Sequence, residues 1–293
     1  MRFVDQYKKG TENGGTYVLT ICIFLLTYIF SIIGVQAVMS ELFSFEDLSN
    51  GETNRNLIFL FQLLPFTCLF IALLICVKFL HKRPILSLFT AREKFDWRRM
   101  FTSFFFWGIL QAILFFGFAW DNIQWNFSSD KFFLLLLISI VLVPIQTAIE
   151  DLFFRGYLFQ GVGKLLKHAG LSLLFTGMLF GLVHAGNPEI NSLGYGLLAF
   201  YVGSGLFLGI IAHMDDGLEL GMGYHLVNNL FGILIIGNDW SALKTDALWI
   251  DASPPDLISA IVVSILCQIA MIVFFSKRYK WSNWKQRLLF RDL

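Results

Sequence analysis

The sequence predicts an all-α, polytopic membrane protein with about eight transmembrane helices. Of the 293 residues, 56% are hydrophobic and 15% are charged, whereas about a quarter of the residues in a soluble domain are charged. The mean hydropathy is +0.67. This composition excludes an ordinary soluble enzyme, and no soluble domain, repeat or low-complexity segment interrupts the sequence. We therefore expect residues 1–293 to form a single transmembrane domain.

Eight apolar stretches come near the roughly 20 residues that a helix needs to cross the hydrocarbon layer. The first three and the last contain no Asp, Glu, Lys, Arg or His, which is typical of scaffold or lipid-facing helices. Spans four to seven hold the ionisable residues and much of the glycine, so we expect the functional site there. The predicted spans are Tyr17–Met39, Leu57–Val77, Met100–Trp120, Phe132–Leu166, Leu171–Ala185, Ile190–Ala212, Leu220–Ile236 and Leu257–Ser276.

The distribution of basic residues supports this topology. If both termini are cytoplasmic and the spans alternate, all 22 Lys and Arg residues except Arg55, Lys131 and Lys244 lie on the cytoplasmic side, as the positive-inside rule requires. The connection Asp215–Glu219 is acidic although it should be cytoplasmic, but acidic residues carry little weight in the rule. The basic segments 78–99 and 277–291 fit the headgroup region better than a nucleic-acid site.

The fourth span is unusually long, and its length decides the depth of its charged residues. Glu150 follows about 18 apolar residues, and the apolar pattern then continues to Lys164. A helix that reaches Lys164 places Glu150 about 21 Å from that end. His184 lies equally far from Gly170 at the start of the fifth span. Two antiparallel helices would therefore bring Glu150 and His184 to a similar depth, provided that the fourth helix does not break after Glu150.

The charged motif in the fourth span divides into two parts. Asp151 and Arg155 are four positions apart with the acid first, which is the favourable order for an ion pair on a helix. Glu150 points about 100° away from that pair. We therefore expect Asp151 and Arg155 to be structural, and Glu150 to act as a general base on water. A buried charge network with no chemical role is the alternative.

Two further motifs supply candidate partners for Glu150. His184 could share the attacking water or carry its proton to a leaving group. His225 and Asn229 are four positions apart on one helix face, where they could stabilise the oxyanion that forms when water attacks a carbonyl. Counting from the turn near Gly217 places His225 only about 12 Å deep, unless the acidic turn dips inward. Interhelical hydrogen bonding is the alternative for all three residues.

Together, the three motifs resemble those of the CPBP family, which comprises the type II CAAX-prenyl proteases and bacteriocin-processing proteins and is also called the Abi family. That family's pattern is Glu-Glu-x-x-x-Arg, then Phe-x-x-x-His, then His-x-x-x-Asn or a similar residue. Here Asp151 stands at the second Glu, and because Asp keeps the charge we expect its pairing with Arg155 to persist. The resemblance covers about residues 132–236, the expected catalytic core. The matching residues are Glu150, Arg155, Phe180, His184, His225 and Asn229.

The resemblance implies an intramembrane endopeptidase that hydrolyses a peptide bond near the cytoplasmic side of the membrane. In such an enzyme Glu150 and His184 activate water, while His225 and Asn229 stabilise the oxyanion. It implies a peptide or membrane-protein substrate, with or without a lipid, and no nucleic-acid partner. It also implies an integral protein of a bacterial plasma membrane, with both termini cytoplasmic.

Two other functions remain open. The residue pattern requires no cofactor, but Glu150, His184 and His225 could in principle ligate Zn²⁺ or Fe²⁺, and older descriptions of the family call its members metalloproteases. The chain could instead be a non-enzymatic bacteriocin-immunity or scaffold protein that keeps the motif helices as a rigid binding core. A proton-coupled transporter fits less well, because the motifs form no evident pathway.

Overall fold

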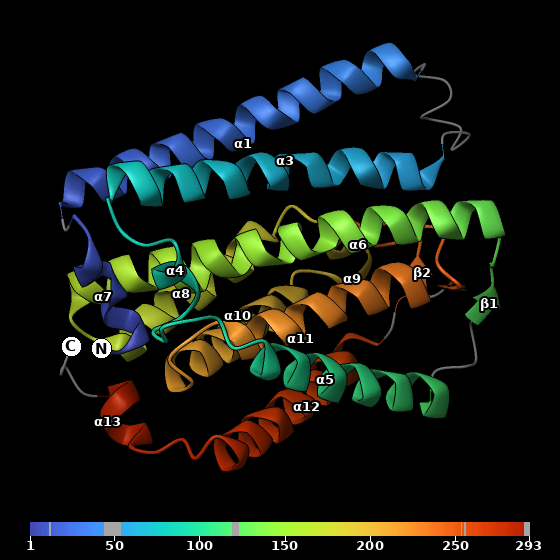
Figure 1. Cartoon of the computed structure of the whole chain (residues 1–293). Coiled ribbons are helices and arrows are strands. Elements are labelled where there is room, and N and C mark those ends of the chain that lie inside the picture. Colours follow the sequence, from blue (N-terminus) through green and yellow to red (C-terminus); the bar gives the residue numbers. More distant parts are fainter. Residues whose placement is uncertain (12, 44–53, 119–122, 253, 255, 290–293) are drawn as a thin grey trace.

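The computed structural model describes residues 1–293 except 12, 44–53, 119–122, 253, 255 and 290–293. Helices dominate this part of the chain, and Figure 1 shows the long ones running side by side. The chain is thus an all-α polytopic membrane protein, as the composition predicts. The main helices are α1 (Gly14–Leu42), α3 (Arg55–Ile75), α5 (Trp97–Phe118), α6 (Ser129–Asp151), α8 (Ala169–Val183), α10 (Leu197–Met214), α11 (Glu219–Leu230) and α12 (Leu257–Arg278).

Two of the eight predicted spans form helices shorter than the roughly 20 residues that cross the hydrocarbon layer. Six helical segments of the described residues are long and apolar enough to cross a membrane, judged by length and composition. Helix α8 is apolar but has only 15 residues, and α11 has 12 residues before a π-helical segment, Phe231–Ile235. Helix α8 packs against α10, and α11 packs against α5 and α6. One face of α8, which includes Phe175 and Leu182, is exposed, so α11 is the more enclosed of the two helices.

Helix α6 is the centre of the bundle. Figure 1 shows α1 and α3 on one side of it and α10, α11, α5 and α12 on the other. Helix α3 and helix α11 both pack against α6, and the contact surface includes the buried side chains of Leu63, Leu135 and Leu226. The large hydrophobic side chains on the outer faces of α1, α5 and α12 are exposed instead, which suits contact with lipid.

The helix that carries Glu150 continues beyond it. After α6 the chain forms a π-helical segment, Leu152–Leu158, and then α7 (Phe159–Leu166), which ends at Lys167 with a φ of 49°. At 1.5 Å per residue, both the segment from Glu150 to Leu166 and the segment from His168 to His184 span about 24 Å. The fourth helix therefore does not break after Glu150, which was the condition for Glu150 and His184 to lie at a similar depth. The π-helical turns were not predicted.

The predicted sixth span begins too early at Ile190. The chain forms a short helix, α9 (Glu189–Leu193), and then breaks before α10 starts at Leu197. Gly194 has a φ of 79°, a left-handed conformation that side chains with a Cβ rarely adopt. This glycine ends α9, so the two helices cannot be continuous.

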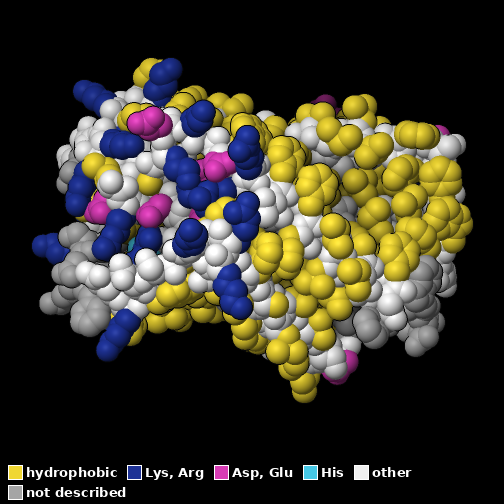
Figure 2. Space-filling view, turned by 60° about the horizontal axis from the view of Figure 1, so that its bottom comes forward, with side chains coloured by type: hydrophobic (Ala, Val, Ile, Leu, Met, Phe, Trp, Pro, Cys, Tyr) yellow, Lys and Arg dark blue, Asp and Glu magenta, His cyan; other side chains and the backbone are white. Residues whose placement is uncertain are grey.

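Charged groups separate the two ends of the bundle. The N-terminal 3₁₀ helix Phe3–Lys9 and helix α13 (Trp284–Leu289) lie at one end, together with α4 (Leu86–Phe89). Figure 2 shows Lys and Arg side chains gathered over this end, and a hydrophobic surface over the rest of the visible face. The two ends of the bundle therefore differ in charge.

The opposite end contains a small sheet that the sequence did not predict. Its strands are β1 (Ile123–Trp125), β3 (Trp249–Asp251) and β2 (Ile236–Asn238), in that order, with β1 antiparallel and β2 parallel to β3. Two of the three basic residues that the predicted topology does not place on the cytoplasmic side lie near this sheet. Arg55 pairs with Asp239 at 2.6 Å, and Lys131 Nζ is 3.8 Å from an Asp246 oxygen.

We predict that Gly156→Ala destabilises the protein by about 2 kcal/mol, as overpacking does elsewhere. A Cβ at this position would lie 2.6 Å from the backbone oxygen of Leu88 in α4, and a backbone atom cannot move aside cheaply. The measurement is thermal unfolding of the purified protein in detergent. Gly34→Ala is the control, because a Cβ there meets nothing within 4 Å. Equal unfolding temperatures for the two variants would contradict the prediction.

Candidate functional site

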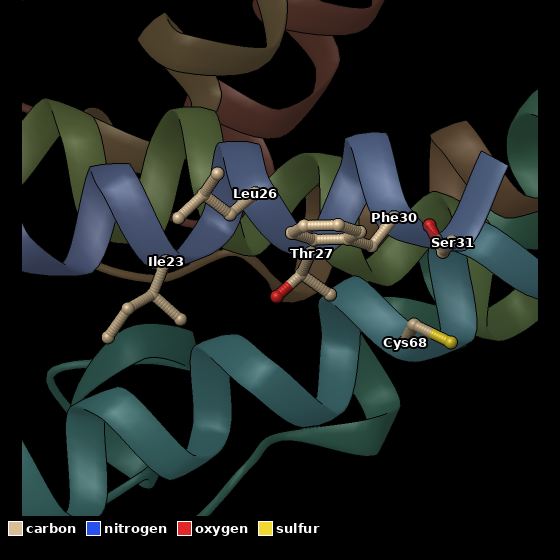
Figure 3. Close-up of a pocket in the computed structure, with 6 residues that line it drawn as sticks. All are labelled: Ile23, Leu26, Thr27, Phe30, Ser31 and Cys68. Carbon is tan, nitrogen blue, oxygen red and sulfur yellow. The ribbon is translucent and has the colours of Figure 1, made fainter. Parts of the chain in front are cut away.

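A cavity of about 850 Å³ opens among α1, α3, α6, α8, α10 and α11. Its wall on α1 and α3 is mainly apolar and includes Phe24, Leu63 and Phe66, whereas polar side chains line the wall formed by the motif-bearing helices. By contrast, the groove of about 440 Å³ between α1 and α3 in Figure 3 is lined by six residues, none of which is Asp, Glu, Lys, Arg or His. The four predicted catalytic residues, Glu150, His184, His225 and Asn229, all line the larger cavity.

Glu150 is the more accessible of the two adjacent acids. Its side chain keeps 15% of its accessible surface, against 2% for Asp151. One carboxylate oxygen accepts a hydrogen bond of 2.5 Å from Gln146 Nε2, and the other lies 3.6 Å from His225 Nε2. Gln146 Oε1 in turn accepts from Asn229 Nδ2 at 3.1 Å. Glu150 therefore faces the cavity while neutral amide groups fix its orientation.

Asp151 joins two of the predicted motifs. Its Oδ1 atom accepts from Arg155 at 3.1 Å, and its Oδ2 atom lies 3.3 Å from His225 Nδ1. Asp151 and Arg155 are both almost fully buried, and the guanidinium carbon of Arg155 lies 4.0 Å from the centroid of the Phe180 ring. The sequence predicts the pairing with Arg155 but not the contact with His225, because α11 lies far from α6 along the chain.

His184 lies just beyond the last residue of α8. Its Nδ1 atom is 2.7 Å from the backbone oxygen of Phe180, and a carbonyl can only accept a hydrogen bond. We therefore assign the hydrogen to Nδ1, which leaves Nε2 as the nitrogen available to a ligand. The imidazole ring stacks on Tyr201 of α10, with ring centroids 4.3 Å apart and planes at 20°.

The acidic turn before α11 does dip inward. Asp215 and Glu219 are buried, and Arg92 reaches both of them at 3.0 Å. Arg99 makes a second contact with Asp215 at 2.5 Å. Burial raises the pKa of the Asp215 carboxyl to about 6, although Arg99 and Arg92 favour its ionised form. His225 Nε2 lies 3.6 Å from a Glu150 oxygen, so the short distance of His225 from the turn does not separate the two residues.

Several polar residues of the cavity were missed by sequence reasoning. Gln146 precedes Glu150 by four positions, so its place on the same helix face could have been recognised. Glu189 is buried and lines the cavity, although the sequence gives it no partner among the motifs. Asn228 also lines the cavity, where its Oδ1 atom accepts from Trp107 at 3.2 Å. No pattern in the sequence marks Tyr201.

The ring nitrogens that face protein groups can be identified for both histidines. Among the residues that the structure describes, no group of three His, Cys, Asp or Glu is placed to hold a metal ion. Nδ1 of His225 faces Asp151, and Nδ1 of His184 faces a backbone carbonyl. In both residues Nε2 is therefore the ring nitrogen left for a water, a substrate or another ligand.

Comparison with known proteins supports the resemblance seen in the motifs. Residues 129–231 match the family model described as type II CAAX prenyl endopeptidase Rce1-like. The chain is also 33% identical over 166 residues to the uncharacterized protein YyaK of Bacillus subtilis strain 168. That alignment covers 55% of this chain and 56% of the relative, so the chain spans just over half of the relative's length. No solved structure gives a significant match.

We predict that Asp151→Asn and Arg155→Gln each destabilise the protein by about 3 kcal/mol. The first leaves the buried Arg155 guanidinium without its ion-pair partner, and the second leaves the buried Asp151 carboxylate with only His225 beside it. The double variant should lose clearly less than the sum of the two, since it removes both charges together. Unfolding in detergent of all four proteins, including the unmodified one, gives the coupling. Additive losses would show that the pair does not stabilise the fold as a unit.

Proposed function

Because residues 129–231 match the type II CAAX prenyl endopeptidase family, we propose that the chain is an intramembrane endopeptidase that uses a glutamate and a histidine to activate water. The observation that carries the mechanism is the shared cavity. Glu150 keeps an accessible carboxylate there, while the neighbouring Asp151 is buried against Arg155. Two adjacent acids thus have different environments, which separates a chemical role from a structural one.

The first step is activation of water between α6 and α8. Glu150 accepts one proton of the water as general base, and Nε2 of His184 accepts a hydrogen bond from it or takes over the proton. The Gln146 amide holds the carboxylate by its other oxygen. The nucleophile is then the water oxygen, so no covalent enzyme intermediate is needed.

The oxyanion lies on the α11 side of the cavity. His225 has a carboxylate near each ring nitrogen, so its protonated form can keep Nδ1–H on Asp151 while Nε2–H turns to the substrate. Asn229 donates one amide hydrogen to Gln146, and its second amide hydrogen can be donated to the oxyanion. Donors placed in this way stabilise the charge that develops on the carbonyl oxygen.

The remaining steps complete the hydrolysis. The water oxygen bonds to the carbonyl carbon, and the tetrahedral intermediate then breaks its bond to the amide nitrogen. Glu150 or His184 returns the proton to that nitrogen as it leaves. The products are a carboxylic acid and an amine, so one water molecule is consumed for each bond cleaved.

The substrate in this proposal is a peptide or membrane protein, with or without an attached lipid, and not a nucleic acid. The cavity combines an apolar wall on α1 and α3 with polar groups on the opposite wall, which suits a chain that has both apolar and amide groups. We propose that the basic end faces the cytoplasm of a bacterial plasma membrane, with both termini on that side. Cleavage then occurs nearer the cytoplasmic face, since the turn that leads to His225 starts at the basic end.

We predict that Glu150→Gln lowers kcat by at least about a thousandfold, because the amide cannot take a proton from water. The fold should persist, since the Gln side chain can still accept the hydrogen bond from Gln146. The assay uses the protein in liposomes and a fluorogenic CAAX-type peptide in farnesylated and unmodified forms. Glu93→Gln, an exposed change on the basic end, is the matched control.

Full cleavage by Glu150→Gln would refute the glutamate mechanism. If the unmodified protein cleaves no peptide, yet protects cells against a bacteriocin equally well with and without Glu150→Gln, the immunity alternative is correct. These two results are distinguishable because the first requires an active parent protein.

We predict that exhaustive chelation leaves peptidase activity unchanged, because in the proposed mechanism Glu150 and His184 activate the water without a metal ion. The protein is dialysed against EDTA and then 1,10-phenanthroline, and initial rates are compared before and after dialysis. A parallel sample is reconstituted with Zn²⁺ to reveal any stimulation. Loss of activity on dialysis that Zn²⁺ restores would establish the metal-dependent alternative.

A further inference from the structure

His184 has few contacts that hold its imidazole ring in one orientation. It follows α8 directly, in a turn and not within the helix. One hydrogen bond joins Nδ1 to the Phe180 carbonyl at 2.7 Å. That hydrogen bond restrains Nδ1 but leaves some freedom in the torsions about the Cα–Cβ and Cβ–Cγ bonds. A change in these torsions would move Nε2 from the position that the proposed mechanism requires.

Stacking on Tyr201 removes that freedom. The two rings are 4.3 Å apart at their centroids and inclined by 20°, an arrangement close to offset stacking. Phe180 contacts His184 from another direction, at 4.7 Å and 53°. The imidazole thus meets one aromatic ring nearly face to face and another at an angle, which defines the plane in which Nε2 lies.

Tyr201 is itself anchored by a buried acid. Its hydroxyl donates to Glu189 Oε1 at 2.5 Å, and Asn187 Nδ2 donates to the same oxygen at 3.1 Å. The other carboxylate oxygen accepts from the backbone nitrogen of Ala242 at 2.9 Å. Glu189 is buried, and these three donors compensate the cost of burying its charge. The carboxylate therefore connects α9, α10 and the loop that follows β2.

We propose that Tyr201 is a positioning residue for the hydrolysis, and that Glu189 holds Tyr201 in place for it. The Tyr201 ring sets the plane of the His184 imidazole and so directs Nε2 toward the water that Glu150 activates. This inference rests on the proposed function. It differs from a purely structural role because it requires the face of the ring and not only the hydroxyl group.

The ring and the hydroxyl can be separated by substitution. In Tyr201→Phe the stacking face remains, so kcat should stay within about threefold of the parent. In Tyr201→Leu the face is lost, and kcat should fall about thirtyfold, since small misplacements of a catalytic group cost one to two orders of magnitude. KM should change less than about twofold in both variants, because the Tyr201 ring acts through His184 on the chemical step.

The experiment measures kcat and KM in liposomes for the parent, Tyr201→Phe and Tyr201→Leu, with the farnesylated fluorogenic peptide. Tyr195→Leu is the control, because Tyr195 lies nearby in sequence and is 75% exposed. Unfolding temperatures are recorded for every variant. If Tyr201→Leu does not fold, Tyr201→Met replaces it, since the flexible Met side chain fills space without an aromatic face.

The proposal is supported if Tyr201→Phe keeps a kcat close to that of the parent while Tyr201→Leu, or Tyr201→Met in its place, does not. The proposal is overturned if Tyr201→Leu, or the Tyr201→Met variant that replaces it, keeps the parental kcat. It is also overturned if Tyr201→Phe loses as much kcat as that variant, because the hydroxyl contact to Glu189 would then be the essential feature. An inactive parent protein would refute the proposed peptidase function instead, and the two failures cannot be confused.

Discussion

The buried carboxylate of Asp151 is the interaction on which the candidate site depends. One of its oxygens binds Arg155 on the same helix, and the other contacts His225 on α11. A buried charge is costly unless it is paired; Arg155 supplies one partner along the chain, and the packing of α11 against α6 supplies His225. The neighbouring Glu150 stands at the cavity surface, where it contacts Gln146 and His225.

The sequence predicted the features that depend on residues close together along the chain. Hydropathy located the helical stretches, and the four-residue spacing of Asp151 and Arg155 predicted their pairing because neighbours on a helix face are fixed by its geometry. The motif residues Glu150, His184 and Asn229 could be nominated for the same reason, since ionisable and amide groups are conspicuous in apolar segments. Their catalytic roles remain proposals.

Contacts between distant segments could not be predicted in this way. The stacking of His184 on Tyr201 and the hydrogen bond between Gln146 and Asn229 depend on how α6, α8, α10 and α11 pack. Tyrosine is unremarkable in an apolar helix, so nothing local marks Tyr201. The π-helical turns after Asp151 and the small sheet were missed because both are set by tertiary packing, and a three-residue strand has too short a pattern to recognise.

The acidic turn before α11 differs in charge from the basic end of the bundle in which it lies, and the structure gives a reason for this. Its carboxylates stand at the basic end of the bundle, where an acidic loop is unexpected. Arg92 and Arg99 lie against Asp215, and Arg92 also pairs with Glu219, so this turn uses cations of the preceding basic segment. Such pairing offsets the cost of burying the Asp215 and Glu219 carboxylates. The buried turn leads directly into α11, and less than two helical turns after Glu219 His225 stands beside Asp151 and Glu150.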